Sequence, residues 1–501
     1  MAGPAPTSSQ LDAFRESADR FMAEMMEEYY LHLAGHKDTL DLEAIYERHA
    51  ELTTQEQAVA LGEAVDGDRR LRELWRFACD GYMGNLTKQH EERAGELSAT
   101  LEAEVDGEKI GYRMLRVEIA NEPDRARRQK LEEARCARGD EHLNPILVDA
   151  SQVGQQAVRE LGARNYYDLY LRFGFRLEEL AAQCRAFLDS TERLFEESAD
   201  RLFRTRVGVP LAEAKRWDTA RFFRAPEWDD RFPSEQMLPA LQTSLADLGV
   251  DLSGQENVEL DIEQREKKSP RAFCAGIEIP ERVLLVIQPK GGLDDWRALF
   301  HESGHAEHFA NTEPGLPVEE KRLGDRAVSE GWAFLLEHMV DDPAWLRRRL
   351  DFGDPGDLVA ESAVTLLWLF RRYSAKLLYE IELHQADDVT AMKSRYVELL
   401  GDALKIEPSE TDWLGDVDGG FYVTEYLRAW AFEAQMRFHL RERFGSEWFT
   451  KREAGSQLRE LWSLGQKQTA DEILRDVTGS EIEVEAVAER VREGLRSSVS
   501  A

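Results

Sequence analysis

Hydrophobic positions recur at helical spacing along most of this chain. The first such pattern comprises Leu11, Phe14, Ala18, Phe21 and Met25. These residues lie three or four positions apart and therefore share one face of a helix. At its start, Ser9 and Asp12 are expected to form a capping box. Similar helical patterns cover residues 71–82, 131–138 and 177–203, so a mainly α-helical protein is predicted.

The pattern changes between about residues 256 and 288. Residues Val258–Ile262 alternate between apolar and polar, residues 272–279 are mixed, and Val283–Ile287 is a continuous aliphatic run that ends at a proline and two glycines. Alternation and short β-branched runs bounded by turn residues are typical of strands. We therefore expect one small sheet of about three strands.

Helical patterns return after this sheet and continue almost to the end of the chain. Asp294 or Asp295 is expected to cap the first of these helices. Its apolar residues are Trp296, Ala298, Leu299 and Phe300. The most apolar stretch of the chain, Ala363–Phe370, is too short to span a bilayer and is interpreted as a buried helix segment.

The composition is that of a globular protein with an acidic surface. A chain of 501 residues with 42% hydrophobic residues is expected to form two or three subdomains. The 97 acidic and 64 basic residues give a net charge of −33. Such a charge disfavours nucleic acids and anionic membranes as partners. We interpret the acidic residues as an ordinary charged surface that keeps the protein in solution.

The cysteines and the N-terminus indicate a reducing compartment. Cys79, Cys136, Cys184 and Cys274 are far apart and form no Cys-x-x-Cys pair, so reduced and mostly buried thiols are expected. The segment from Met1 to Gln10 lacks the pattern of a secretion signal. A cytoplasmic location is therefore predicted.

A metal-binding pattern follows directly on the predicted sheet. His301 and His305 are four residues apart, so on a helix both imidazoles project from one face and can reach one ion. Two histidines and a carboxylate are a standard ligand set of catalytic zinc, and Glu330 is the expected third ligand. One zinc ion per chain is predicted, with Glu302 as the base that takes a proton from the zinc-bound water and returns it to the leaving amine.

Two other zinc-peptidase patterns fit less well. A metzincin would have a glycine and a third histidine in the positions of His308 and Asn311, so His308 is expected to pack or to support the site. The segment around Glu278 is weakly similar to the amine-binding motif of large zinc aminopeptidases but lacks its asparagine. Glu278 is therefore interpreted as an ordinary strand residue.

The sequence from Leu299 to His308, with Glu330 at the expected spacing, resembles the thimet oligopeptidase and oligoendopeptidase F family of zinc peptidases. Further similarity lies in three segments: Lys268–Cys274, Asn165–Tyr167 and Phe421–Tyr426. The resemblance spans about residues 160–480 and is closest at 268–332. It implies a mainly helical zinc-peptidase fold, with the small sheet beside the zinc helix and a deep substrate cleft, that cuts short peptides in the cytosol.

The resemblance also implies a role for two tyrosines. An oxyanion intermediate needs a hydroxyl donor, and Tyr426 is the first candidate and Tyr422 the second. Gly419-Gly420 would give this segment freedom to close over substrate, whereas the other interpretation of the tyrosines is ordinary helix packing. The chain departs from the family in two places: Asp416 or Asp418 stands where a histidine is common, and Thr424 where a tyrosine is common.

These observations predict two regions, an N-terminal helical region over residues 1–160 and a zinc-peptidase catalytic region over residues 161–501. The predicted function is hydrolysis of peptide bonds in short peptides. One alternative is a metallocarboxypeptidase, in which Arg428 or Lys290 holds the substrate carboxylate. The other is a non-catalytic peptide-binding protein, against which the intact ligands and base argue.

Overall fold

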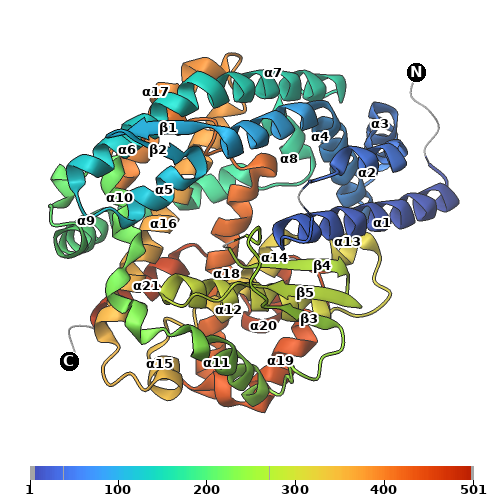
Figure 1. Ribbon diagram of the computed structural model, residues 1–501. Helices are drawn as coiled ribbons and strands as arrows, with labels where there is room; N and C mark the ends of the chain where they lie inside the picture. The colour runs from blue at the N-terminus through green and yellow to red at the C-terminus, as the bar shows by residue number, and fades with distance from the viewer. Residues whose placement is uncertain (1–5, 38, 270, 498–501) are drawn as a thin grey trace. The chain divides into compact units, whose positions relative to one another are not determined.

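The computed structural model describes residues 6–37, 39–269 and 271–497, and most of them are helical (Figure 1). The prediction of a mainly α fold with little sheet is confirmed. The chain forms two compact units that alternate along the sequence. Unit 1 comprises the chain up to Ala78, Pro226–Ser362 and the chain from Glu425 on, and unit 2 comprises Cys79–Ala225 and Ala363–Thr424. A regional boundary near residue 160 stays a prediction.

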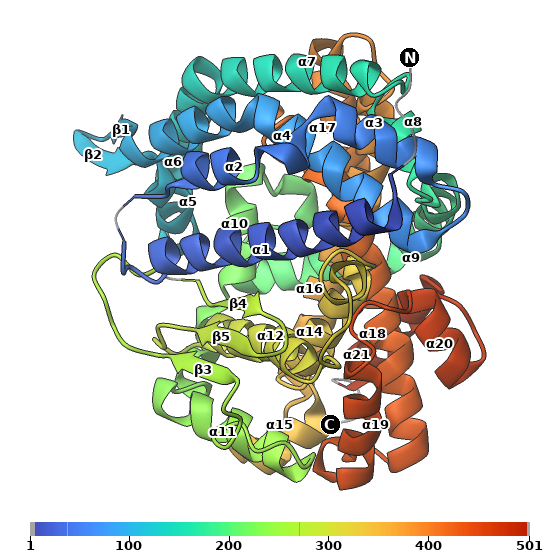
Figure 2. The same cartoon turned by 90° about the vertical axis from the view of Figure 1, so that its right-hand side faces the viewer.

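Unit 1 contains the larger sheet and the C-terminal helices. Its helices are α1 (Ser8–Leu33), α2 (Leu42–Arg48), α3 (Gln55–Ala64), α11 (Ser234–Asp247), α12 (Leu293–Ala310), α13 (Val318–Lys321), α14 (Arg326–Glu337), α15 (Pro343–Leu350), α19 (Arg452–Trp462), α20 (Ala470–Thr478) and α21 (Glu485–Ser497). Most of α18 (Tyr422–Phe444) also belongs to it. Figure 2 shows α19, α20 and α21 gathered around α18, and an ion pair of 2.8 Å between Arg441 and Glu493 joins α18 to α21.

Unit 2 is helical apart from one hairpin. Its elements are β1 (Glu102–Val105), β2 (Glu108–Gly111), α5 (Tyr112–Asn121), α6 (Arg125–Arg138), α7 (Asn144–Glu160), α8 (Tyr166–Arg172), α9 (Leu177–Arg206), α10 (Arg216–Arg224) and α17 (Lys393–Leu404). Most of α4 (Arg69–Thr100) and of α16 (Gly356–Leu383) also belongs to it. The helical patterns predicted at 71–82, 131–138 and 177–203 thus lie in α4, α6 and α9.

The sheet of unit 1 has the strands that the sequence predicted. They are β3 (Val258–Asp261), β4 (Phe273–Glu278) and β5 (Arg282–Val286), in the order β3-β5-β4. β5 is parallel to β3 and antiparallel to β4. Ala275 and Leu284 lie in a core cluster with Ala34, just after α1. On the other face, a Cβ placed on Gly276 would lie 3.2 Å from the ring of Phe309 in α12. Helices therefore cover both faces, and β4 is an edge strand close to α12.

Both predicted helix caps are wrong by a few residues. At α1 the cap is Thr7, whose backbone N–H donates to Gln10 Oε1 at 2.8 Å while its hydroxyl accepts from the Gln10 N–H. At α12 the cap is Gly292, and the Asp295 carboxylate accepts from the backbone N–H of Lys290 at 2.7 Å. In each case the side chain that closes the turn is long enough to reach a backbone N–H outside the helix.

The expectation of a single sheet is also wrong, because β1 and β2 form a separate antiparallel hairpin. Asp106 and Gly107 make its turn with φ values of 53° and 83°. An Asp-Gly pair between two short alternating segments is a strong hairpin signature. The many charged residues of both strands obscure the apolar positions, which are Ala103, Val105 and Ile110.

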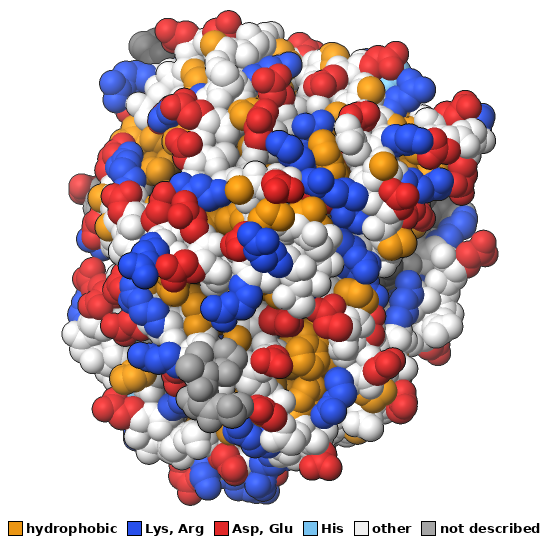
Figure 3. Space-filling view, turned by 90° about the vertical axis from the view of Figure 1, so that its left-hand side faces the viewer, with side chains coloured by type: hydrophobic (Ala, Val, Ile, Leu, Met, Phe, Trp, Pro, Cys, Tyr) orange, Lys and Arg blue, Asp and Glu red, His pale blue; other side chains and the backbone are white. Residues whose placement is uncertain are grey.

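The surface agrees with the interpretation of the acidic composition. Figure 3 shows acidic and basic side chains interspersed over one face, with the hydrophobic side chains in small separate groups. Within the described ranges, we find no helix whose length and apolar character would let it cross a membrane. The apolar segment Ala363–Phe370 lies inside α16 and is mostly buried. Residues Met1–Ala5, part of the segment examined for a secretion signal, lie outside the described residues.

All four cysteines are free thiols, as predicted. Cys79, Cys136 and Cys184 are buried, and Cys274 is half-buried. Burial raises the pKa of the Cys136 thiol, which keeps it protonated at neutral pH and makes it a small apolar side chain rather than a nucleophile.

Candidate metal centre

Two helices, α12 and α14, build the candidate site, and their backbones meet at a glycine. A Cβ on Gly304 would lie 2.5 Å from Ala333 Cα and 2.5 Å from the Trp332 carbonyl oxygen. No side chain fits there, so only glycine allows this close crossing. Gly331, next to Glu330 on α14, makes a similarly close approach to Phe432 of α18. The close crossing brings Glu330 to the face of α12 that carries His301 and His305.

His301, His305 and Glu330 form the one group of candidate metal ligands in the part of the chain that the structure describes, with ligand atoms all within 4.8 Å of one another. The Nε2 atoms of His301 and His305 lie 3.5 Å and 3.7 Å from Glu330 Oε2. The two rings meet edge to face, with centroids 5.0 Å apart. Two imidazole nitrogens and one carboxylate oxygen thus converge on one point, which is the donor set of a catalytic zinc site.

A hydrogen bond at Nδ1 orients each imidazole, whose Nε2 faces Glu330. His301 Nδ1 lies 2.8 Å from Glu337 Oε2, and His305 Nδ1 lies 2.8 Å from Ser329 Oγ. An Nδ1–H that donates to an oxygen leaves the lone pair on Nε2, where a metal can bind. Sequence reasoning missed both partners. Glu337 could have been found, since it lies two helical turns after Glu330 and so on the same face of α14.

Burial and charge act in opposite directions on the two histidines. Burial alone would lower the pKa of His301, but its hydrogen bonds to Glu330 and Glu337 outweigh burial and hold that pKa well above its ordinary value. Burial lowers the pKa of His305 to about 4, although Glu330 opposes the shift. The group therefore concentrates negative charge around two imidazoles, an environment that favours a bound cation.

Glu302 lies between the two histidines in sequence and turns toward the sheet. Its Oε2 accepts a hydrogen bond of 2.9 Å from the backbone N–H of Cys274 on β4. Burial raises the pKa of Glu302 to about 7, and the nearby charge of His301 opposes this shift. A carboxyl group with a pKa near neutrality can both take and give a proton, which suits a general base.

His308 is not part of the group. It is almost fully buried, with 1% of its surface exposed, and its Nε2 lies 3.1 Å from the Gly465 carbonyl oxygen. This contact agrees with a packing role. Glu278, the other rejected candidate, is the exposed last residue of β4, as expected of a strand residue.

The two candidate tyrosines lie in different units. Tyr426 belongs to unit 1, where its ring centroid lies 6.3 Å from that of Phe334. The Phe334 ring in turn lies 5.1 Å from the His301 ring, so the His301 and Tyr426 rings share Phe334 as a neighbour. Tyr422 belongs to unit 2, and its role stays a prediction.

The residues at the two departures from the family pattern have structural partners. Asp416 pairs with Arg372 and accepts a hydrogen bond of 2.8 Å from Tyr396. Asp418 pairs with Lys376 at 2.7 Å. The Thr424 hydroxyl donates to the Phe421 carbonyl oxygen at 2.8 Å, which stabilises the first turn of α18.

Replacing Glu337 by Gln is expected to weaken metal binding about tenfold, within the 10- to 100-fold range typical of such partners. An amide accepts the His301 Nδ1–H less strongly than a carboxylate and removes one nearby negative charge. The affinity can be measured by competition with a chromophoric chelator. Glu453→Gln, on the exposed face of α19, removes the same charge elsewhere and should leave the affinity unchanged. Equal affinities of the two variants would contradict a role for Glu337.

The comparisons with known proteins support the fold. No protein-family model matches the sequence, and no curated protein matches it. Among solved structures, the fold is similar to the crystal structure of a "putative oligoendopeptidase F" from Bacillus anthracis str. Ames, with a TM-score of 0.61 and 15% sequence identity over 99% of this chain and 86% of that one. At this identity the similarity establishes a shared fold, the mainly helical fold that the motifs around His301 predicted.

Proposed function

We propose that this protein is a zinc-dependent peptidase that hydrolyses peptide bonds within short peptides. The observation that carries the proposal is the convergence of His301, His305 and Glu330, with ligand atoms within 4.8 Å of one another and with Glu302 beside them. The similarity in fold to the protein described as a "putative oligoendopeptidase F" supports the same reaction class.

Zinc is the metal that the donor set favours. Zinc commonly binds imidazole nitrogen together with carboxylate oxygen, whereas calcium and magnesium prefer sites in which all ligands are oxygen atoms. The hydrogen bonds from His301 and His305 to Glu337 and Ser329 fix both Nε2 lone pairs toward the same point. A zinc ion bound there would supply a Lewis acid that polarises the scissile carbonyl group and acidifies a water molecule.

Glu302 is the proposed general base. Its carboxylate accepts the proton of the attacking water and later delivers it to the nitrogen of the leaving amine. The hydrogen bond from the Cys274 N–H at 2.9 Å orients the carboxylate and leaves its second oxygen available for the proton. The same hydrogen bond connects Glu302 to β4 and so holds its carboxylate in a constant position relative to the sheet.

The edge strand β4 is the proposed binding surface for the peptide backbone. It has β5 on one side only, and an extended peptide can add to such an edge by main-chain hydrogen bonds. Arg322 donates to the carbonyl oxygens of Gly276 and Ile277 at 2.7 Å and 2.6 Å, and the Cys274 N–H donates to Glu302. A peptide would therefore pair with other backbone groups in the part of the strand before Gly276. A peptide bound there would pass the metal group in an extended conformation.

A carboxypeptidase is the alternative that the residues allow, and the contacts of Arg428 argue against it. Its guanidinium pairs with Asp325 at 2.6 Å, with Asp471 at 3.0 Å and with Glu425 at 3.3 Å. An arginine already bound to these carboxylates has little capacity for a substrate carboxylate. Lys290 is exposed and is the remaining candidate for that alternative. A non-catalytic binder would not need Glu302 beside three ligands.

Digestion of a defined peptide mixture by the zinc-loaded protein tests the function, with the products identified by mass spectrometry. Cuts at internal bonds of short peptides are expected, while a tightly folded protein should be spared. Removal of single residues from the C-terminus would establish the carboxypeptidase alternative. An unchanged mixture would leave only the non-catalytic alternative.

Tyr426→Phe is expected to lower kcat about 10²-fold with a much smaller change in KM, because loss of one oxyanion donor acts mainly on the transition state. Steady-state kinetics on one peptide measures both constants. The matched control is Tyr422→Phe, which deletes the same atom four residues earlier. If Tyr426→Phe keeps a normal kcat and Tyr422→Phe does not, the donor is Tyr422; if neither changes kcat, both tyrosines serve packing.

A further inference from the structure

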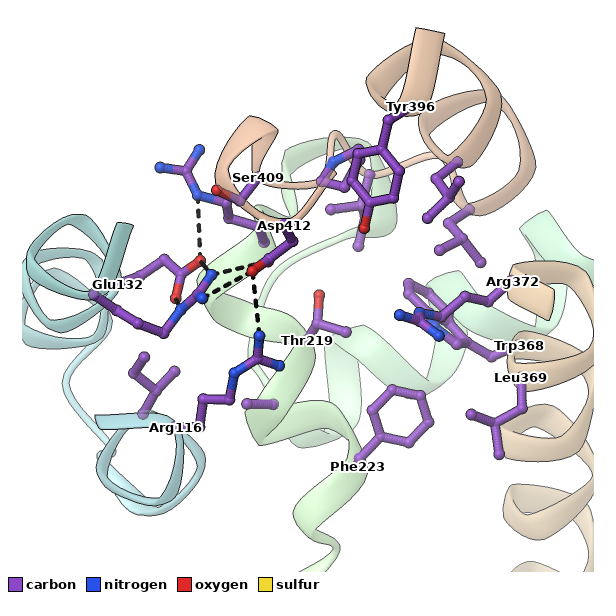
Figure 4. A pocket seen from close by; sticks show the side chains of 18 of the residues that line it. Arg116, Glu132, Thr219, Phe223, Trp368, Leu369, Arg372, Tyr396, Ser409 and Asp412 are labelled. Carbon is purple, nitrogen blue, oxygen red and sulfur yellow. Dashed lines mark hydrogen bonds and ion pairs between the residues drawn. The ribbon is translucent and has the colours of Figure 1, made fainter. Parts of the chain in front are cut away.

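Unit 2 contains a cavity of about 380 Å³ that has no part in the proposed peptidase site. Helices α5, α6, α10, α16 and α17 and residues 406–412 line it. Its volume lies within the range of small-molecule sites, about 300–1,000 Å³. Figure 4 shows Phe223, Trp368 and Leu369 on one side of the space, with Arg372, which pairs with Asp416, beside them.

The opposite side is a network of arginines and carboxylates. Arg135 binds Glu132 at 2.8 Å and Asp412 at 2.9 Å. Two further arginines share the same carboxylates: Arg116 lies 3.2 Å from Asp412, and Arg216 lies 3.5 Å from Glu132. Three guanidinium groups thus share two carboxylates, and this wall carries an excess positive charge although the whole protein carries a net charge of −33.

The two outer arginines keep unused hydrogen-bonding capacity. A guanidinium has five N–H donors, and the Arg116 side chain, which is 70% exposed, makes a single ion pair. The buried Nε of Arg216 makes no hydrogen bond within the described parts of the chain, and its partner in the ion pair named above is Glu132 Oε1 at 3.5 Å. These donors lie where the charged wall borders the cavity, so an anion there would gain hydrogen bonds without breaking the Arg135 pairs.

Polar groups between the two walls complete the arrangement. Figure 4 shows the Thr219 side chain and the Tyr396 ring reaching into the middle of the space from opposite sides. The Tyr396 hydroxyl donates to Asp416 at 2.8 Å, which fixes that ring in position. The cavity is therefore amphipathic along its length, from the arginines through hydroxyl groups to the aromatic wall.

We infer that this cavity is a binding site for a small organic carboxylate with an aromatic or branched aliphatic body. The carboxylate would lie against Arg116 and Arg216, because the planar guanidinium fork matches a carboxylate in two parallel hydrogen bonds. The apolar body would lie against Phe223, Trp368 and Leu369, where its burial contributes about 25 cal/mol per Å². A cation is disfavoured by the excess of arginines, and a bare inorganic anion would leave the aromatic wall without a partner.

Isothermal titration calorimetry of the full-length protein tests this inference with phenylpropionate as the probe. Two probes of nearly the same shape, phenylpropanol and phenylpropylamine, replace its carboxylate by a neutral group and by a cation. Saturable binding of phenylpropionate at a single site is expected, with phenylpropanol at least tenfold weaker and no binding of phenylpropylamine. Peptide hydrolysis is not the readout, so the result does not depend on the proposed function.

Variants assign the binding to this cavity. Arg116→Gln and Arg216→Gln should each weaken binding of phenylpropionate about tenfold, which is the loss of one charge-assisted hydrogen bond. Thr219→Phe should abolish binding because the larger side chain fills the middle of the cavity. The control is Arg193→Gln on α9, whose side chain is 90% exposed. It removes the same charge at a residue that does not line the cavity and should bind normally.

Four outcomes would overturn the inference. The first is the absence of phenylpropionate binding at millimolar concentration. The second is equal binding of the three probes, which would indicate a merely apolar site. The third is displacement of phenylpropionate by inorganic phosphate alone at similar concentration, which would indicate a simple anion site. The fourth is an unchanged affinity in Arg116→Gln.

Discussion

Glu302→Gln is expected to reduce kcat by about 10²- to 10⁴-fold while the protein keeps its metal. The amide of glutamine has nearly the same shape as the carboxyl group but cannot accept a proton from the attacking water, so the contribution of general base catalysis, typically of this size, is lost. Glu302 is not among the three convergent ligands, and its replacement should therefore leave the metal stoichiometry unchanged. Steady-state kinetics together with metal analysis measures both parts of the prediction.

Glu278→Gln is the matched control for this variant. Glu278 is exposed at the end of β4, on the same strand that holds Glu302 through Cys274, and it contributes no contact to the metal group. Its replacement should leave kcat and KM unchanged. Retained turnover in Glu302→Gln would remove that residue as the base, whereas a loss in both variants would indicate that changes at β4 disturb the site indirectly.

Removal of the metal is expected to abolish peptide hydrolysis, and one zinc ion per chain should restore it. The three convergent side chains provide a single ligand set, and the carboxylate and imidazoles lose their charge balance when the cation leaves. Elemental analysis of the purified protein should find about one zinc per chain, and dialysis against a chelator followed by titration with zinc should restore activity with an end point at one equivalent.

Thermal unfolding provides a test of metal binding that does not use activity. A ligand that binds only the folded protein stabilises it by RT ln(1 + [L]/Kd), which is about 2.7 kcal/mol at 100 times Kd. The melting temperature of the chelated protein should therefore rise on addition of zinc, and this rise should be smaller for Glu330→Ala. Full activity after exhaustive chelation, or a purified protein without any transition metal, would contradict the assignment.

The sequence determined the class of fold and the core of the candidate site. Apolar residues such as Phe14, Ala18 and Phe21 are buried on one face of α1, as their helical spacing predicted. The three strands between Val258 and Val286 also lie where their patterns predicted them. These predictions succeed because local periodicity records which face of an element is buried. The spacing of His301 and His305 succeeds for the same reason, since a helix places residues four apart on one face.

Local signatures were less reliable at the ends of elements and in charged segments. The caps of α1 and α12 are Thr7 and Gly292 and not the predicted residues. At α1, several polar residues near the helix start can accept the same backbone hydrogen bonds, whereas the cap of α12 makes no side-chain hydrogen bond. The hairpin around Asp106 and Gly107 was missed although its turn is typical. Its strands carry exposed glutamates that conceal the alternation.

Only the tertiary structure decided how distant residues meet. The close crossing of α12 and α14 at Gly304 brings Glu330 to the histidines, and it also gives His301 its partner Glu337 and His305 its partner Ser329. The arginine network around Arg135 joins α6 to the segment that contains Asp412 in the same way. A sequence pattern records the period of its own helix or strand, whereas these contacts depend on the angle and distance between elements far apart in the chain, which packing of the whole core determines.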